Sequence, residues 1–441
     1  MKINIKIFTS SLLVAFSMML TNCNMDIKNP NGPTDAQILN TRDGLITLSV
    51  GLRQNYSTAG LGALILTPGT TSRELKGITT FTNIIEIEAG GTALPTFNGN
   101  ILGVWLRMYR VIGIADDIIA NAPTALASDA GMRSGVVAHA HLFKAMALGG
   151  LATSFEKLPL QTDKLGKATF SDRTEALKSA VKLLDDAVAL VASTAPSTEF
   201  RTKVTGTDFD LINTIQAYRA RYNMMLGNYD AALTAANAVD LTKKSSFVYN
   251  AQSQNPIFTA VQISKDYAPR ENFGLPTALV DAADKRLGFY LGVPTPDIPV
   301  LGERIKRLIG FFDAIDRPIP AYLPDEMRLI RAEANLRKAT PDIAAALTDI
   351  NAVRTQTSGD AFGVNAGLPA YAGEQTKEGL LTEVYKQRSA ELFMTGLRFE
   401  DSRRFGRPSP PTSLAERSRN FYPYPDQERL TNPNTPTDPA N

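Results

Sequence analysis

Helical hairpins limit the folds open to this sequence more than any other feature. Near 207–240, a helix-length segment ends in Leu-Gly-Asn-Tyr-Asp-Ala-Ala, where Gly227 permits a tight reversal and the alanines permit close packing of a second helix. Further hairpins are predicted near 131–193, where apolar residues recur at helical spacing, and near 322–356, where Pro341 suits a first helical position. The sequence therefore predicts a mostly α-helical fold with little β-structure.

The hairpins resemble tetratricopeptide units, but they do not form a continuous array, so a pure solenoid is not expected. Two irregular insertions are predicted instead, near 60–100 and 241–321. In the first, Ile84, Glu86 and Glu88 suggest a short strand or an extended loop. The second is rich in proline and in aromatic residues, which argue against disorder in so long a segment. It is therefore expected to be ordered and to carry function.

The N-terminus has the layout of a secretory signal. Residues 1–22 combine a short basic region with an apolar stretch too short and too rich in hydroxyls for a good transmembrane helix. Cys23, the only cysteine of the chain, closes this stretch like the acylated cysteine of a bacterial lipoprotein, and an ordinary signal peptide with an incidental cysteine is the alternative. Residues 23–35 suit a short tether, followed by one domain over 36–441. No later segment is expected to span a membrane.

Composition argues against several classes of function. The 46 basic and 44 acidic residues nearly balance, which argues against a nucleic-acid partner and against a charged surface that binds anionic lipid. One cysteine excludes an internal disulfide and a cysteine-based zinc site. His139 and His141 would point to different faces of a helix and could not share a metal ion. Without a nucleophile elbow, a P-loop or a dinucleotide motif, we expect no catalytic residues, no metal site, no cofactor and no enzymatic activity.

The C-terminal part of the chain carries the most distinctive motif. Residues 388–406 follow the pattern R-x-x-E-L-x-x-x-G-x-R-x-x-D-x-x-R-x-G, and a Tyr-Pro-Tyr-Pro-Asp run begins at Tyr422. With Trp105 followed by Tyr109, and with the lone Cys23, these motifs resemble the SusD/RagB family of outer-membrane lipoproteins. The resemblance implies a SusD-like fold in which tetratricopeptide-type hairpins form the scaffold and long irregular loops are inserted.

The motif residues themselves are expected to be structural. Trp105 should lie in the core rather than form a sugar platform, and Gly396 should allow a close approach or a positive φ. Charged side chains stay buried only when they are paired, so ion pairs are expected among the charged residues of the motif. These residues are Arg388, Glu391, Arg398, Asp401 and Arg404.

The resemblance also implies a function. Such a protein would capture oligosaccharides, or peptides in some members, without catalysis, and deliver them to a SusC-like, TonB-dependent outer-membrane transporter. It would be held at the cell outer membrane by its lipid anchor alone, facing outwards. Because Trp105 is assigned to the core, stacking on sugars would fall to Phe or Tyr. The candidate ligand contacts are Arg73, Phe81, Phe97, Asn98, Tyr267, Phe289 and Tyr290.

Two other classes of protein stay open at this point. One is a lipid-anchored, tetratricopeptide-like scaffold protein in the periplasm, which the irregular 241–321 segment argues against. The other is an all-helical glycoside hydrolase, which would need two carboxylates held apart across a groove.

Overall fold

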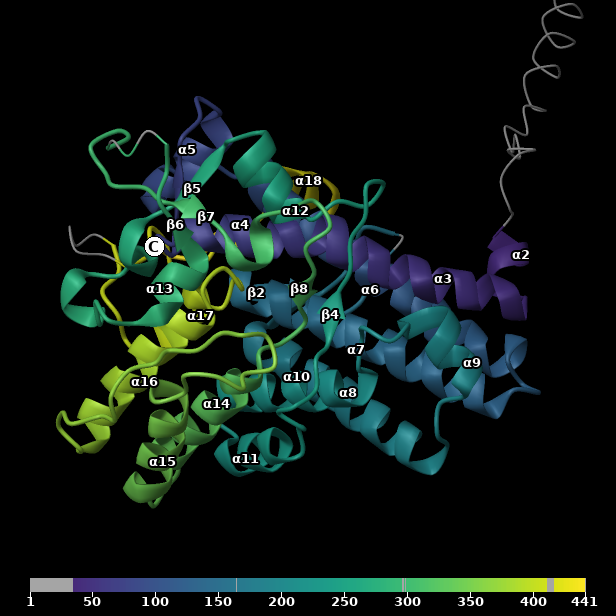
Figure 1. Cartoon of the computed structure of the whole chain (residues 1–441). Helices are drawn as coiled ribbons and strands as arrows, with labels where there is room; N and C mark the ends of the chain where they lie inside the picture. Colours follow the sequence, from purple (N-terminus) through teal and green to yellow (C-terminus); the bar gives the residue numbers. More distant parts are fainter. Residues whose placement is uncertain (1–34, 164, 296, 298, 411–415, 441) are drawn as a thin grey trace, which may run out of the picture.

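The computed structural model describes residues 35–163, 165–295, 297, 299–410 and 416–440. Helices dominate this part of the chain, and the predicted mostly α-helical fold is confirmed (Figure 1). The helices of the first half are α2 (Asp35–Leu39), α3 (Arg42–Asn55), α4 (Leu61–Thr71), α5 (Thr82–Ala89), α6 (Gly99–Ala125), α7 (Ala130–Ser154), α8 (Arg173–Ser193), α9 (Thr198–Phe200) and α10 (Leu211–Leu226). The second half contains α11 (Tyr229–Asn237), α12 (Pro256–Phe258), α13 (Lys285–Tyr290), α14 (Pro324–Arg337), α15 (Ile343–Arg354), α16 (Lys377–Glu391), α17 (Arg398–Arg404) and α18 (Asp426–Thr431).

The long helices pack side by side in a continuous series. Helix α7 packs against α6 and α8, α10 against α8 and α11, and α14 against α11, α15 and α16. Gly227, with φ +77°, ends α10 in the left-handed conformation and lets the chain reverse into α11. This series is the rigid base on which the less regular segments lie (Figure 1).

Short antiparallel strand pairs lie on this base. The described strands are β1 (Leu75–Gly77), β2 (Lys157–Pro159), β3 (Phe170–Asp172), β4 (Ser246–Phe247), β5 (Tyr267–Pro269), β6 (Leu291–Gly292), β7 (Arg307–Leu308) and β8 (Ile319–Pro320). They pair as β1–β5, β2–β3, β4–β8 and β6–β7. The pair β1–β5 joins the two segments that the sequence marks as irregular, with Leu75 opposite Pro269.

The prediction of an irregular segment over 60–100 is wrong for α4 and α5. Helix α4 is buried along nearly its whole length, so it has apolar residues on all sides and lacks the one-sided period by which helices are recognised. Ile84, Glu86 and Glu88 lie on α5 rather than on a strand. The only strand described in this segment is β1, which precedes them.

The expectation that no segment after residue 35 could span a membrane also needs correction. By length and composition, α7 would qualify as a membrane span. In the fold, 78% of its apolar window is buried inside the protein, between α6 and α8. Its apolar character is therefore accounted for by the core.

The tryptophan and the charged motif lie in the interior. Trp105 is 3% exposed and packs against the rings of Phe155 and Tyr424. Arg388 on α16 donates two hydrogen bonds to Asp401 on α17, at 2.8 and 3.1 Å, as the sequence predicts. This buried pair therefore holds α16 and α17 together, whereas Glu391 pairs with Arg286, outside the motif.

Candidate ligand-binding site

The structure contradicts a ligand role for two of the candidate residues. Asn98 is fully buried and caps α6, where its side chain accepts hydrogen bonds from the backbone N–H groups of Asn100 and Ile101. Tyr290 is also fully buried, and its hydroxyl donates to the backbone oxygen of Glu391 at 3.1 Å. Both side chains are used inside the fold and cannot reach a ligand.

Two further aromatic candidates pack within the fold. Tyr267 lies on β5 and is 7% exposed. Phe289 is half-buried, with its ring edge-on to those of Tyr290 and Phe311 at centroid distances of 4.8 and 5.3 Å. Phe289 packs on neighbouring rings and Tyr267 is buried, so both are placed for packing rather than for stacking on a sugar.

Phe81 and Phe97 do lie on the surface. They are 60% and 65% exposed, and each directly precedes a helix or its cap, at the starts of α5 and α6. The Asn98 side chain donates to the backbone oxygen of Asn83 at 2.9 Å, which ties the two helix starts together. Ile85, one turn after Phe81, is 49% exposed. This end of the fold therefore presents an apolar surface to solvent.

Arg73 lines an open cleft of about 370 Å³. We call it the Arg73 cleft. Its described lining residues are Arg73, Arg270, Glu271, Asn272, Gly274, Leu275, Pro276, Thr277, Glu303, Arg304 and Glu416. Arg73 is thus the one sequence candidate in the cleft, and the other lining residues were not predicted.

A tight crossing of two backbone segments shapes the cleft. Pairing of β1 with β5 brings residues 73–75 against 269–274, and the backbone N–H of Arg270 donates to the Glu74 oxygen at 3.0 Å. Gly274 has φ +71°, and a Cβ there would collide with the backbone oxygen of Arg73. Arg73 and Asn272 also have positive φ values of 65° and 56°. Strained backbone of this kind tends to cluster at functional sites.

A network of four charges adjoins the cleft, and two of its members, Arg270 and Glu303, line it. Arg270 donates to Glu88 and to Glu303, both at 2.5 Å, and Lys76 bridges the same two carboxylates at 3.1 and 3.0 Å. Partial burial opposes ionisation of Glu303, but the hydrogen bonds from Arg270 and Lys76 outweigh it and lower its pKa to about 2. Glu303 is therefore a fixed anion at neutral pH, already matched by cations.

Two arginines of the cleft are free to bind something else. Within the described residues, the guanidinium groups of Arg73 and Arg304 make no hydrogen bond or ion pair. Burial, and then the neighbouring charge of Arg270, lower the pKa of Arg73. A guanidinium donates hydrogen bonds and accepts none, so the pair suits the carboxylate, phosphate or hydroxyl oxygens of a ligand. No described residue that lines the cleft is aromatic.

Glu74 follows Arg73 in the chain and is fully buried. It accepts a hydrogen bond from the backbone N–H of Met394 at 3.2 Å, and its nearest cation, Arg398, is 4.0 Å away. Burial raises the pKa of Glu74 to about 7, against the opposing attraction of Arg398. The carboxyl therefore changes its charge near neutral pH.

We expect Glu74→Gln to change how stability depends on pH. The pKa of Glu74 is about 7 in the fold against an ordinary value of 4.5, so its protonated form contributes stability that is fully present below 4.5 and is lost as the pH rises through 7. Glutamine resembles the protonated form at every pH. Free energies of unfolding, measured with denaturant at about pH 5 and pH 8, should show the stability of the variant rising relative to that of the wild type by on the order of 3 kcal/mol. A gap that stays constant across this range would contradict this account of Glu74.

Comparison with solved structures decides the fold. A SusD homolog from Bacteroides thetaiotaomicron matches with a TM-score of 0.71 at 12% identity, over 92% of this chain and 99% of its own. A SusD-like carbohydrate binding protein from Bacteroides fragilis matches with a TM-score of 0.68 at 16% identity, over 90% of this chain and 100% of its own. The chain has the SusD fold. A SusD superfamily protein from Bacteroides vulgatus also matches, with a TM-score of 0.68 at 14% identity over 90% of this chain and 98% of its own.

Comparisons by sequence alone match no family model and no curated protein. The SusD fold persists at identities of 12–16% because helix packing tolerates many apolar substitutions that keep volume and pattern. The similarity covers the scaffold and the inserted loops alike, since about nine-tenths of this chain is matched.

Proposed function

We propose that this protein captures nutrients, chiefly oligosaccharides, and delivers them to a SusC-like, TonB-dependent outer-membrane transporter. The SusD fold over nearly the whole chain supports the proposal, because solved structures of this fold include proteins described as SusD-like carbohydrate binding and putative sugar binding. Cys23 would carry the lipid anchor at the outer face of the cell outer membrane; it lies outside the described residues.

The observation that carries the proposal is the Arg73 cleft. It is open and polar, and two of its arginines have no hydrogen-bond or ion-pair partner among the described residues, which suits reversible capture of a hydroxyl- or carboxylate-bearing ligand. With arginines and no aromatic ring among its described lining residues, the cleft favours acidic saccharides, such as those that carry uronic acids, over neutral chains. A peptide carboxylate presents the same chemistry.

The charges of the cleft also favour binding over catalysis. Glycoside hydrolysis needs one carboxylic acid that is protonated near neutral pH and a second carboxylate nearby. Glu303, with a pKa of about 2, does not supply that acid. Glu416 accepts hydrogen bonds from Tyr385 and Arg407, at 2.6 and 2.9 Å, and is engaged within the fold. Glu74 has a pKa of about 7, but it is fully buried and is not among the described lining residues. Glu271 also lines the cleft, so these contacts argue against Glu303 and Glu416 as the acid and support a non-catalytic role only to that extent.

Arginine variants test the cleft. Arg73→Ala combined with Arg304→Ala should weaken binding of an acidic oligosaccharide about 10-fold or more, since a hydrogen bond to a charged group contributes roughly 1.5–3 kcal/mol. Isothermal titration calorimetry against acidic and neutral oligosaccharides and short peptides measures the effect. Arg110→Ala, an exposed arginine on α6 outside the cleft, is the matched control. Equal affinity of the double variant and the wild type would place the binding site elsewhere.

A further inference from the structure

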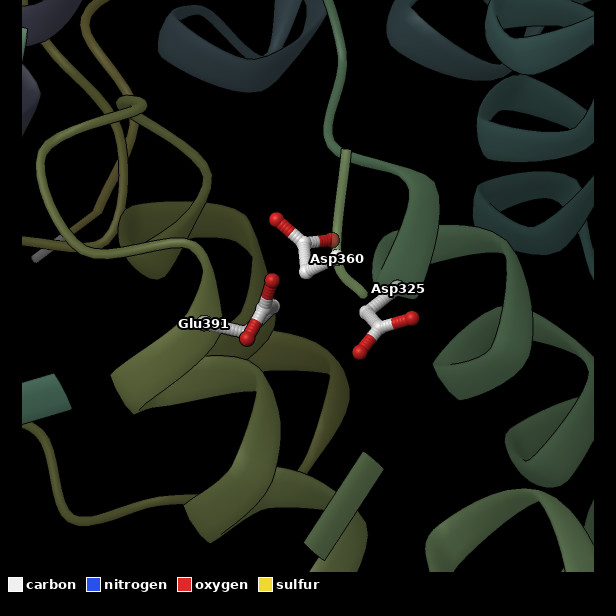
Figure 2. Close-up of side chains that lie close together, drawn as sticks. All are labelled: Asp325, Asp360 and Glu391. Atoms are coloured by element: carbon white, nitrogen blue, oxygen red, sulfur yellow. The ribbon is translucent and has the colours of Figure 1, made fainter. Parts of the chain in front are cut away.

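A group of three carboxylates lies apart from the Arg73 cleft, where three segments of the scaffold meet. Asp325 stands in the first turn of α14, Asp360 in the connection that follows α15, and Glu391 at the last residue of α16. One carboxylate oxygen from each residue lies within 4.8 Å of the other two. Figure 2 shows the three side chains next to one another, each from a different segment.

The group is buried and carries more negative charge than its surroundings compensate. Asp325 and Glu391 are 1% and 0% exposed, and Asp360 is half-buried. The nearby cations are Arg286, which donates to Asp284 at 2.7 Å and to Glu391 at 3.1 Å, and Arg328, which donates to Asp325. Among the described residues, four carboxylates thus face two guanidinium groups. Burying unmatched charge is costly, so a further positive charge is expected here.

In two of the three carboxylates, one oxygen accepts hydrogen bonds from the protein and the second oxygen has no partner among the described residues. Glu391 accepts from Arg286 through Oε2, while its fully buried Oε1 has no hydrogen-bond partner among the described residues. Asp360 accepts from the backbone N–H groups of Phe362 and Val364 through Oδ1, at 2.8 and 2.9 Å, while its buried Oδ2 has no partner there. In Figure 2 the Glu391 carboxylate lies beside that of Asp360. Outer hydrogen bonds that fix ligands in place are typical of metal sites.

We propose that Asp325, Asp360 and Glu391 bind a divalent cation of the calcium type. Calcium takes carboxylate oxygens at about 2.3–2.6 Å in flexible arrangements, so ligand oxygens up to 4.8 Å apart fit around one ion. All three ligands are hard oxygen donors, which suit calcium better than zinc or copper. Two positive charges would also match the excess negative charge of the group. The ion would join α14 to the end of α16 and to the connection after α15, so it would stabilise the scaffold.

The cation is tested on the whole mature protein without any nutrient, so the result does not depend on the proposed function. After treatment with EDTA and its removal, calcium at ~1 mM should raise the melting temperature by about 2 °C or more. Asp360→Asn should sharply reduce this rise, because a neutral amide oxygen binds calcium more weakly than a carboxylate. In the absence of calcium the same variant should melt no lower than the wild type, because it removes one unmatched negative charge.

A matched variant separates the site from a general effect of removing an aspartate. Asp240 also accepts a backbone hydrogen bond in a loop, from Thr242 at 3.0 Å, but it is exposed. Asp240→Asn should keep the full calcium-dependent rise. The proposal is overturned if the wild type melts at the same temperature with EDTA and with calcium, which would mean that the three carboxyls share protons instead. A rise that is undiminished in Asp360→Asn, or that only magnesium produces, overturns it equally.

Discussion

Asp401→Ala should cost about 3 kcal/mol or more of folding free energy, because it leaves the buried Arg388 without its ion-pair partner and removes one of the two carboxylates that pair with Arg404. Asp401 is 3% exposed and accepts hydrogen bonds from Arg388 at 2.8 and 3.1 Å and from Arg404 at 2.8 Å. Burial opposes ionisation of Asp401, but Arg388 and Arg404 hold its pKa below the ordinary value. Arg404 also pairs with the buried Glu333, which links α17 to α14. Denaturant unfolding measures the loss.

An exposed aspartate provides the control for Asp401→Ala. Asp43 has an 89% exposed side chain and lies 3.7 Å from Arg42, so its replacement by alanine should change stability by no more than about 1 kcal/mol. Equal unfolding midpoints for Asp401→Ala and Asp43→Ala would show that the buried charge pairs do not hold α16 and α17 together.

Gly396→Val should also destabilise the protein strongly, for two separate reasons. Gly396 has φ +80°, and a Cβ there would collide with the backbone oxygen of Leu64 on α4. The left-handed conformation costs a non-glycine residue roughly 1–2 kcal/mol, and the collision adds the cost of moving α4 within a packed core. We expect a total loss of about 3 kcal/mol or more.

A second glycine separates the two reasons. Gly302, in the turn between Val300 and Glu303, has φ +78° but nothing within 4 Å of the position of a Cβ, so Gly302→Val should show the conformational cost alone. Thermal unfolding of both variants gives the comparison. If Gly396→Val loses no more stability than Gly302→Val, the close approach of residue 396 to α4 does not matter for stability.

Local signals in the sequence predict much of the scaffold. Gly227 marks the reversal between α10 and α11 because its left-handed conformation is one that glycine adopts readily. Helix α4 escapes prediction because a helix that is buried all round has no polar face, and its sequence contains Gly, Pro and Thr. The family resemblance predicts the fold as a whole, because its motif contains residues that join helices in the interior. Arg388 and Asp401, which pair α16 with α17, are an example.

The sites depend on contacts that the sequence does not display. Choosing aromatic residues from the irregular segments fails for Tyr267 and Tyr290, because short strands in this fold are packed with buried rings. Asn98 could have been recognised as the N-cap of α6, since Asn is a common capping residue. Arg304 joins Arg73 only through the pairing of distant segments. The three carboxylates meet only where α14, the connection after α15 and α16 converge.

The central claim, delivery of nutrients to a transporter, is tested most directly by isolating the tagged full-length protein from detergent-solubilised outer membranes and identifying its partners by mass spectrometry. A TonB-dependent barrel that co-purifies in stoichiometric amount is the predicted result. Degradative enzymes encoded near that barrel would then indicate the class of saccharide to test on the Arg73 cleft. Recovery of the protein alone, or together with periplasmic assembly factors, would contradict the account and favour a periplasmic scaffold.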